Sequence, residues 1–272
     1  MRRIVTKAKQ YQRGMNLAVA CLVCLLGALP CGAQTAAPEV HVLAASDLQP
    51  VMPALAAEFE HASGIKLVLS FGSSATLATQ ILNGDPADLF LAADNTFPEK
   101  IVAAGLADTP EPVAYARGTL VLWARKDSPL QPLTQNTLRD GKFASLAIAN
   151  PDHAPYGRAA VAALEWMKVY DAVKAKIVQA ENIAQTAQFV ESGNAQLGLI
   201  SLTSASTAHM MEIGAFERIP REAYPEIRQC AVVMRKSMHR GDAHAFLDWM
   251  RSPAVQENLT KYGLERVDEP TH

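Results

Sequence analysis

Several features that mark enzymes are missing from this chain of 272 residues. It contains no Gly-x-Ser-x-Gly nucleophile turn, no His-Glu-x-x-His metal-binding helix, no Walker loop and no Gly-x-Gly-x-x-Gly dinucleotide fingerprint. The sequence is therefore not expected to be an enzyme of a familiar kind. Two other classes stay open: a hydrolase that pairs Ser74 with one of the seven histidines, and a sensor or adhesion domain that binds no small anion.

Cysteine is scarce, and three of the four cysteines lie in or beside an apolar segment near the N-terminus (Cys21, Cys24 and Cys31). We interpret their spacing as signal composition and not as a metal or redox motif. Lipidation is not expected, because a modified cysteine at position 21 would leave too short an apolar region before it. Cys230 then remains alone, so no intrachain disulfide is predicted.

The N-terminal residues have the pattern of a secretory signal. Five basic residues and no acids lie between Arg2 and Arg13, an apolar run extends from about Leu17 to Leu29, and small residues follow at Cys31-Gly-Ala33. The apolar run is too short for a stable membrane span, and no later segment is long enough to cross. The sequence thus predicts that residues 1–33 are removed and that the mature chain is soluble and exported.

Positive charge is also in short supply after this segment. Removal of the five basic residues changes the formal net charge from −2 to −7. No basic run remains that would bind nucleic acid or an anionic membrane surface. Neither partner is expected, and an anion would have to be recognised by local groups.

The remaining 239 or so residues are enough for one large or two modest α/β domains. Strand-like apolar runs alternate with helical patterns, which predicts parallel strands joined by crossover helices. A return of the chain to the first domain near its end predicts lobe 1 from residues 39–118 plus 231–272, and lobe 2 from residues 119–230. The predicted strands are 40–45, 65–70, 88–92, 118–124, 146–150, 197–201 and 230–234. A first helix is predicted to follow Ser46 and to end at about residue 61, and further helices are predicted at 74–82, 157–168, 182–190 and about 242–262.

Two serines occupy turns between a predicted strand and a predicted helix, Ser46 in Ala44-Ala-Ser-Asp-Leu and Ser74 in Phe71-Gly-Ser-Ser-Ala-Thr-Leu. Free N–H groups and the positive end of the helix dipole meet at such a point, which favours an anion even without lysine or arginine. A serine there is more often a simple helix cap. Two such turns together predict an oxyanion receptor.

Five separated motifs follow one another along essentially the whole mature chain: Ala44-Ala-Ser-Asp-Leu, Ser70-Phe-Gly-Ser-Ser-Ala-Thr-Leu-Ala-Thr-Gln-Ile, Gly84-Asp-Pro-Ala-Asp-Leu-Phe-Leu-Ala-Ala-Asp94, Asn150-Pro-Asp-His-Ala-Pro-Tyr-Gly157 and Leu197-Gly-Leu-Ile. Together and in this order they resemble the periplasmic molybdate-binding component of ABC importers. The resemblance implies an α/β, two-lobed type II periplasmic-binding-protein fold with a ligand cleft between the lobes, in the periplasm. It also implies capture of molybdate or tungstate, no cofactor, a monomer, and delivery to an importer permease with its ATPase.

Carried over by position, the resemblance places Ser46 and Ser74 on the ligand through hydroxyl and N–H groups, and Tyr156 and Ile183 through the backbone. No site for a metal ion is expected apart from the molybdenum of that oxyanion. This chain has Ser201 where the family pattern supplies a tyrosine hydroxyl after the Gly-Leu-Ile strand. A serine is too short to reach the same point, so a water-mediated fifth contact is predicted. A receptor for another tetrahedral oxyanion, such as sulfate, is the alternative.

Three titratable residues near these motifs are assigned no ligand role. Asp88 and Asp94 flank a predicted buried strand, and a carboxylate in an anion cleft would repel the ligand. We expect both to be structural. His153 is close in sequence to Tyr156 and is expected to be a loop residue without contact to the ligand.

Overall fold

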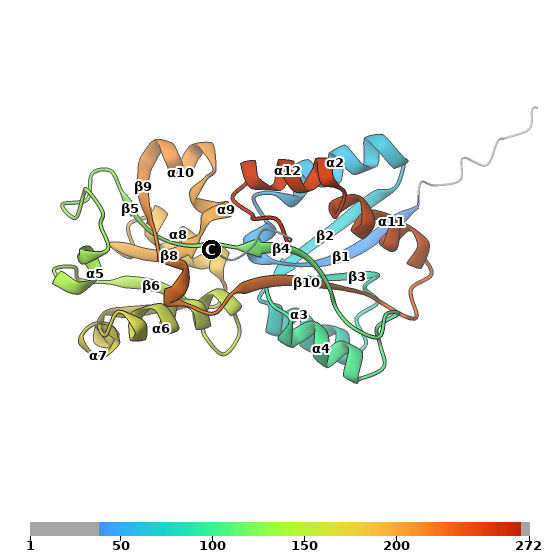
Figure 1. Cartoon of the computed structure of the whole chain (residues 1–272), viewed down its shortest axis with the longest axis horizontal. Helices are drawn as coiled ribbons and strands as arrows, with labels where there is room; N and C mark the ends of the chain where they lie inside the picture. Colours follow the sequence, from blue (N-terminus) through green and yellow to red (C-terminus); the bar gives the residue numbers. More distant parts are fainter. Residues whose placement is uncertain (1–37, 268–272) are drawn as a thin grey trace, which may run out of the picture. The chain divides into compact units, whose positions relative to one another are not determined.

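The computed structural model describes residues 38–267, so the predicted signal segment lies outside the described residues. The region that follows residue 36 is one compact unit, and its strands form two five-stranded sheets (Figure 1). No helix in the part of the chain described here is both long and apolar enough to cross a bilayer. The mixed α/β fold class predicted from the sequence is confirmed.

The first sheet has the strand order β2-β1-β3-β10-β4. β1 is parallel to both β2 and β3, whereas β10 is antiparallel to both β3 and β4. Its strands are β1 (Glu39–Ala45), β2 (Lys66–Gly72), β3 (Leu89–Ala92), β4 (Val113–Gly118) and β10 (Ile227–Val233).

The second sheet has the order β7-β6-β8-β5-β9. β6 is parallel to β7 and β8, while β5 is antiparallel to β8 and β9. Its strands are β5 (Leu120–Arg125), β6 (Leu146–Ala149), β7 (Ile177–Ala180), β8 (Leu197–Ser201) and β9 (Gly214–Arg218).

The prediction of parallel strands is correct for β1–β3 and for β6–β8 but wrong for β5 and β10. β4 passes through Thr119 directly into β5, so the chain enters the second sheet without a crossover helix. After β9 and the short helix η3 (Arg221–Ala223), the chain returns to the first sheet as β10. Each sheet therefore contains a strand of opposite direction. The division into lobes of residues 39–118 plus 231–272 and 119–230 stays a prediction.

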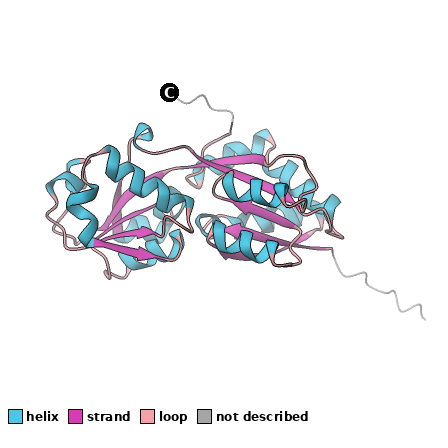
Figure 2. Ribbon diagram, turned by 90° about the horizontal axis from the view of Figure 1, so that it is seen from below, coloured by secondary structure: helices cyan, strands magenta, loops and turns pink. Residues whose placement is uncertain are grey.

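Helices cover both faces of each sheet (Figure 2). In β1, Val40 and Val42 belong to a core with α2, α11 and α12, whereas Leu43 belongs to a core with α3 and α4. The two-residue period of a strand sends alternate side chains to opposite faces. In this part of the chain the helices are α2 (Met52–Ser63), α3 (Ser74–Leu82), α4 (Thr96–Ala103), α11 (Arg240–Met250) and α12 (Pro253–Lys261).

The same alternation builds the core of the second sheet. Leu120 and Leu122 of β5 pack with α6, whereas Val121 and Trp123 face a core shared with α8, α9 and α10. The helices here are α5 (Asn136–Asp140), α6 (Pro155–Trp166), α7 (Tyr170–Val173), α8 (Ile183–Glu191), α9 (Leu202–Ala205) and α10 (Ala208–Ile213), with the short helix η2 (Lys174–Lys176); a further short helix, η1 (Ser46–Leu48), follows β1.

The C-terminal helical stretch predicted from 242 to 262 is two helices. α11 ends at Met250, and Pro253 begins α12 with Ser252 before it. Proline has no N–H to donate and its ring blocks the preceding turn, but it fits the first turn of a helix. Pro253 therefore ends the possibility of one continuous helix, although the helical spacing of apolar residues is present both before and after it.

Candidate anion-binding site

A small cavity is lined by residues at the ends of β1, β2 and β3 and by residues at the starts of α6 and α8. Its open volume of about 10 Å³ is close to that of one water-sized probe, so its walls lie near contact. Four of the five predicted ligand residues line it: Ser46, Ser74, Tyr156 and Ile183. The full lining consists of Ala45, Ser46, Asp47, Gly72, Ser73, Ser74, Ala93, Ala154, Pro155, Tyr156 and Ile183.

Neither predicted serine acts as a helix cap. Ser74 is the first residue of α3, and the capping side chain is that of Ser73, whose Oγ accepts a hydrogen bond from Thr76 N. The Ser74 Oγ instead accepts from Ala93 N over 3.1 Å. Because this bond uses an oxygen lone pair, the Ser74 hydroxyl proton remains available to an acceptor.

Ser46 begins η1 directly after β1 and is almost fully buried. Its carbonyl oxygen accepts from Gln49 N, and the short helix η1 has no side-chain cap. The cap interpretation, which is the ordinary one for a serine at such a turn, therefore fits neither Ser46 nor Ser74.

Tyr156 and Ile183 lie in the first turns of α6 and α8. The first N–H groups of a helix have no acceptor within it, and no turn, loop or cap hydrogen bond of the described residues uses these two N–H groups. Of the two reciprocal hydrogen bonds of the predicted capping box at Asn182, only one forms. The Asn182 side chain accepts from Gln185 N, but the Gln185 side chain accepts from Glu181 N and not from Asn182 N.

The lining is electrically neutral except for one carboxyl group. It contains no lysine, arginine or histidine among its residues. Apart from the Asp47 carboxyl and the Tyr156 hydroxyl, its polar side chains are serines, and backbone N–H groups lie at the starts of α3, α6 and α8. The described residues also contain no cluster of histidine, cysteine, aspartate or glutamate suited to a metal ion. Such a lining offers hydrogen-bond donors to an anion without adding a counter-charge.

Ser201 does not line this cavity. It ends β8 and caps α9, where its Oγ accepts from Ser204 N and forms hydrogen bonds with the Thr203 and Ser204 hydroxyls. Because the single Thr203 proton goes to the Asp47 carbonyl oxygen, the Ser201 hydroxyl donates to Thr203 and accepts from Ser204. The hydroxyl is fully buried and already uses its donor and acceptors. The structure thus brings four predicted residues together and leaves the fifth in a neighbouring network.

That network contains a group that the motifs did not single out, Asp47. Its Oδ2 accepts hydrogen bonds from Gln229 Nε2 and, over 3.3 Å, from the Tyr156 hydroxyl. The Thr203 hydroxyl donates to the Asp47 carbonyl oxygen over 2.7 Å. Burial raises the pKa of the Asp47 carboxyl to about 7, although the bonds from Gln229 and Tyr156 oppose this shift. The position of Asp47 directly after Ser46 in its motif was the signal that could have found it.

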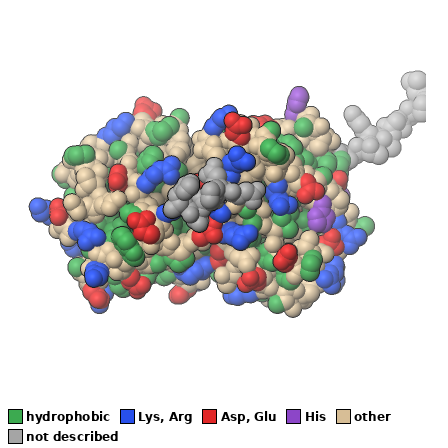
Figure 3. All heavy atoms as spheres, viewed as in Figure 1, with side chains coloured by type: hydrophobic (Ala, Val, Ile, Leu, Met, Phe, Trp, Pro, Cys, Tyr) green, Lys and Arg blue, Asp and Glu red, His purple; other side chains and the backbone are tan. Residues whose placement is uncertain are grey.

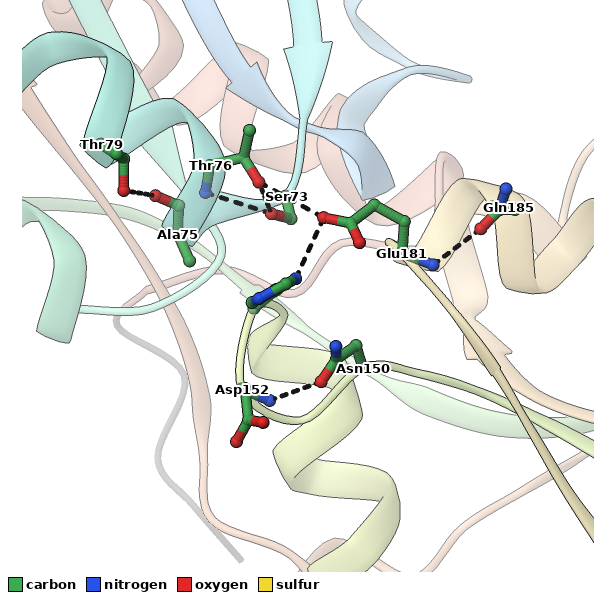
Figure 4. A network of polar contacts seen from close by, with 9 residues as sticks. Ser73, Ala75, Thr76, Thr79, Asn150, Asp152, Glu181 and Gln185 are labelled. Carbon is green, nitrogen blue, oxygen red and sulfur yellow. Dashed lines mark hydrogen bonds and ion pairs between the residues drawn. The ribbon is translucent and has the colours of Figure 1, made fainter. Parts of the chain in front are cut away.

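The three residues that were assigned no ligand role are bonded elsewhere. Asp88 accepts from His41 N over 2.8 Å and from the Ser237 hydroxyl over 2.6 Å. Asp94 accepts from Phe97 N and pairs with Arg158. In the contacts drawn in Figure 4, Glu181 accepts from Thr76, and it also lies 3.0 Å from the ring nitrogen Nδ1 of His153.

Charged groups of both signs are interspersed over the face seen in Figure 3. No field of one sign dominates that face, which agrees with the lack of a basic run in the sequence.

Comparison with known proteins identifies close relatives over most of the chain. A family model described as bacterial extracellular solute-binding protein matches residues 40–265. The molybdate-binding protein ModA of Azotobacter vinelandii is 38% identical over 251 residues, which cover 92% of this chain and 98% of that protein. ModA of Rhodobacter capsulatus is 30% identical over 93% of this chain and 98% of that protein.

Solved structures share the same architecture. The periplasmic molybdate-binding protein of Azotobacter vinelandii has a TM-score of 0.79 and 30% identity, covering 85% of this chain and 100% of that chain. The sulfate-binding protein SubI from Mycobacterium tuberculosis H37Rv has a TM-score of 0.69 and 16% identity, covering 85% of this chain and 88% of that chain. At this lower identity, the similarity shows the fold alone.

Proposed function

Since the chain belongs to the family of bacterial extracellular solute-binding proteins, we propose that it captures molybdate, and tungstate equally well, and delivers it to an ABC importer. The observation that carries this proposal is the convergence of Ser46, Ser74, Tyr156 and Ile183 on one cavity. Full-length similarity to molybdate-binding relatives supports the choice of ligand.

The proposed ligand set consists of neutral donors. The Ser46 and Ser74 hydroxyl and N–H groups and the N–H groups of Tyr156 and Ile183 would replace the water around a tetrahedral dianion. Each charge-assisted hydrogen bond contributes about 1.5–3 kcal/mol net. Several such bonds offset the cost of removing the anion from water, and the bound anion keeps its charge.

Cavity size would select among tetrahedral anions. Molybdate and tungstate have longer bonds from the central atom to oxygen than sulfate, so a site fitted to them leaves some donors unpaired around sulfate. An unpaired buried donor costs about 1–3 kcal/mol. Molybdate and tungstate are nearly isosteric, so we expect comparable affinities for the two.

Binding requires the walls of the cavity to separate and close again. Residues of α3 and η1 beside the first sheet and of α6 and α8 beside the second surround the cavity, whose open volume is only about 10 Å³. We therefore propose that two lobes, residues 39–118 plus 231–272 and residues 119–230, close on the anion. The closed form would dock on the permease, and its ATPase would supply the energy for transport.

The family works outside the cytoplasm, as its description states. We propose the periplasm as the compartment, reached by means of the predicted signal at residues 1–33, and a monomer as the working form. No cofactor is needed for capture of this kind.

The fifth contact stays a proposal of its own. Ser201 would reach the anion through a bridging water after its hydroxyl gives up one of its present bonds to Thr203 or Ser204. The hydrolase alternative finds little support, because no histidine lines the cavity beside Ser74.

Isothermal titration of the mature protein with molybdate, tungstate, sulfate and phosphate tests the function. We expect one molybdate or tungstate per chain, similar affinities for both, and a higher melting temperature with either ligand, because each binds the folded state alone. A preference for sulfate or phosphate would replace the assignment by a different oxyanion receptor. Absence of heat and of thermal shift with every anion would favour the sensor or enzyme classes.

A further inference from the structure

The wall of the anion-binding cavity contains a buried acid, Asp47. Its side chain is 0% exposed, and it lies next to Ser46 in the lining. A carboxylate at this position would share a small, buried cavity with a bound dianion. Like charges in a low-dielectric environment repel strongly, so the site needs a means of removing one of them.

No cation neutralises Asp47 among the residues that the structure describes. Its carboxyl hydrogen bonds come from the Tyr156 hydroxyl on α6 and the Gln229 amide on β10, and its Oδ1 has no partner. Further titratable groups of this region are the Tyr115 hydroxyl on β4, which donates to the Ala92 carbonyl oxygen, the Cys230 thiol on β10 and the Tyr224 hydroxyl. Burial raises the pKa of each of them above its ordinary value, so all three are neutral near pH 7.

The remaining elements packed against η1 are β2, α8 and α9. Gly72 and Ser73 after β2 and Ile183 on α8 line the same cavity and are uncharged. From α9, the Thr203 hydroxyl donates to the Asp47 carbonyl oxygen and not to its carboxyl group. The groups of β2, α8 and α9 that lie beside Asp47 are thus all uncharged.

The surroundings favour the protonated acid. Burial raises the pKa of Asp47 to about 7 and that of the Tyr156 hydroxyl well above its ordinary value, so the tyrosine stays neutral. An added dianion in the same cavity would raise the carboxyl pKa further. Oδ1 accepts no hydrogen bond, so it is the carboxyl oxygen on which the proton can be placed without breaking an existing bond.

We propose that Asp47 is protonated whenever the oxyanion is bound, so that capture of the anion takes up one proton from water. The inference rests on the proposed oxyanion-binding function. The proton is held on Oδ1 and returns to water on release, and no covalent bond to the anion forms. A protonated carboxyl group is neutral and can donate a hydrogen bond, whereas an ionised one only accepts and would repel the dianion.

Proton coupling gives a definite pH dependence. Below the pKa of the unliganded carboxyl, the proton is already present and affinity does not change with pH. Above it, the dissociation constant for molybdate increases by up to about tenfold per pH unit, because each capture must also bind a proton. The Asp47→Asn variant mimics the neutral acid, so its affinity should be nearly independent of pH.

The test is isothermal titration with molybdate between about pH 6.5 and 9, repeated at each pH in buffers with different ionisation enthalpies; the dependence of observed heat on buffer enthalpy counts the protons taken up. For the wild type we expect uptake to increase with pH toward about one proton per anion. Asp47→Asn should show none and should bind more tightly than the wild type at the upper end of the range. The control is Asp88→Asn, because Asp88 is a buried acid just before β3 and outside the cavity; this variant should behave as the wild type.

Two results overturn the proposal. The first is molybdate binding by the wild type without proton uptake, a measurement that depends on no variant and on no variant's folding. The second is proton uptake that persists in Asp47→Asn and disappears in His153→Gln, which would place the proton on the histidine paired with Glu181. Failure of the proposed function looks different, because the wild type would then bind no molybdate at any pH.

Discussion

The backbone N–H of Ala75 donates a hydrogen bond to the carbonyl oxygen of His153 over 3.1 Å. Ala75 lies in the first turn of α3, beside the first sheet, and His153 lies in the loop between β6 and α6 of the second. Next to this bond, the Thr76 hydroxyl donates to Glu181 Oε1 over 3.4 Å, and the same oxygen lies 3.0 Å from His153 Nδ1 (Figure 4). These contacts join the two walls of the cavity at its edge.

Replacement of Glu181 should speed release of the anion. Glu181→Ala removes the acceptor shared by Thr76 and His153, so the closed arrangement loses contacts while the cavity donors remain. Exposed polar pairs of this kind contribute modestly, and we expect the dissociation rate of molybdate to increase by about two- to fivefold. Stopped-flow displacement measures it. Glu257→Ala, on the surface of α12, is the control, and equal dissociation rates in both variants would exclude a role for these contacts in closure.

Removal of either cavity serine hydroxyl should weaken binding without unfolding the protein. Ser46→Ala and Ser74→Ala each delete a charge-assisted donor, which corresponds to about a tenfold or greater increase in the dissociation constant. Titration gives the affinity and circular dichroism the fold. The matched control is Thr207→Ala, whose side chain caps α10 away from the cavity. It should lower the melting temperature and spare affinity; wild-type affinity in both serine variants would contradict the proposed site.

Ser201→Ala should reduce affinity less than either of these changes. The hydroxyl is outside the cavity lining and bonded to Thr203 and Ser204, so its predicted contact with the anion is through water. A loss of about two- to fivefold in affinity is expected. A ligand-bound crystal structure with neither the Ser201 hydroxyl nor a water on the anion would disprove the contact.

Gly157→Ala should displace the start of α6 and with it the Tyr156 N–H. A Cβ atom at Gly157 would lie 2.3 Å from the carbonyl oxygen of Ala149, a backbone atom that no rotamer change can move. We expect at least a tenfold loss of molybdate affinity together with a lower melting temperature. Gly241→Ala is the control, because nothing lies within 4 Å of the added Cβ. A Gly157→Ala variant with unchanged affinity would show that α6 is not held by this contact.

The unliganded protein should lose stability as pH rises through neutrality. The pKa of Asp47 is raised to about 7 in the folded state, compared with about 4 for an exposed aspartate. The folded state therefore binds the proton more tightly, and this stabilisation is complete below about pH 4 and disappears as pH rises through 7. The loss is at most about 4 kcal/mol. Urea unfolding between about pH 5 and 8 should show a steeper decline for the wild type than for Asp47→Asn; parallel curves would refute the shift.

Local patterns were enough to predict many elements. The expected bounds of α3 and β8, Ser74–Leu82 and Leu197–Ser201, agree with those observed. In α3 the Ser73 cap and the following Asn83-Gly-Asp-Pro86 end signal are contained in neighbouring residues, so their physical effect does not depend on distant contacts. The α/β class follows from the same kind of information, since the apolar period within each segment decides strand or helix.

By itself, then, the sequence determined the α/β class and, through motifs in collinear order, the proposed ligand class. Only the tertiary structure decided the directions of β5 and β10 and the burial of Asp47. The bonds to the Asp47 carboxyl come from Tyr156, 109 positions away, and from Gln229, 182 positions away. A protonation equilibrium set by burial depends on which distant side chains exclude water from the group, and no local pattern around Ser46 contains that information.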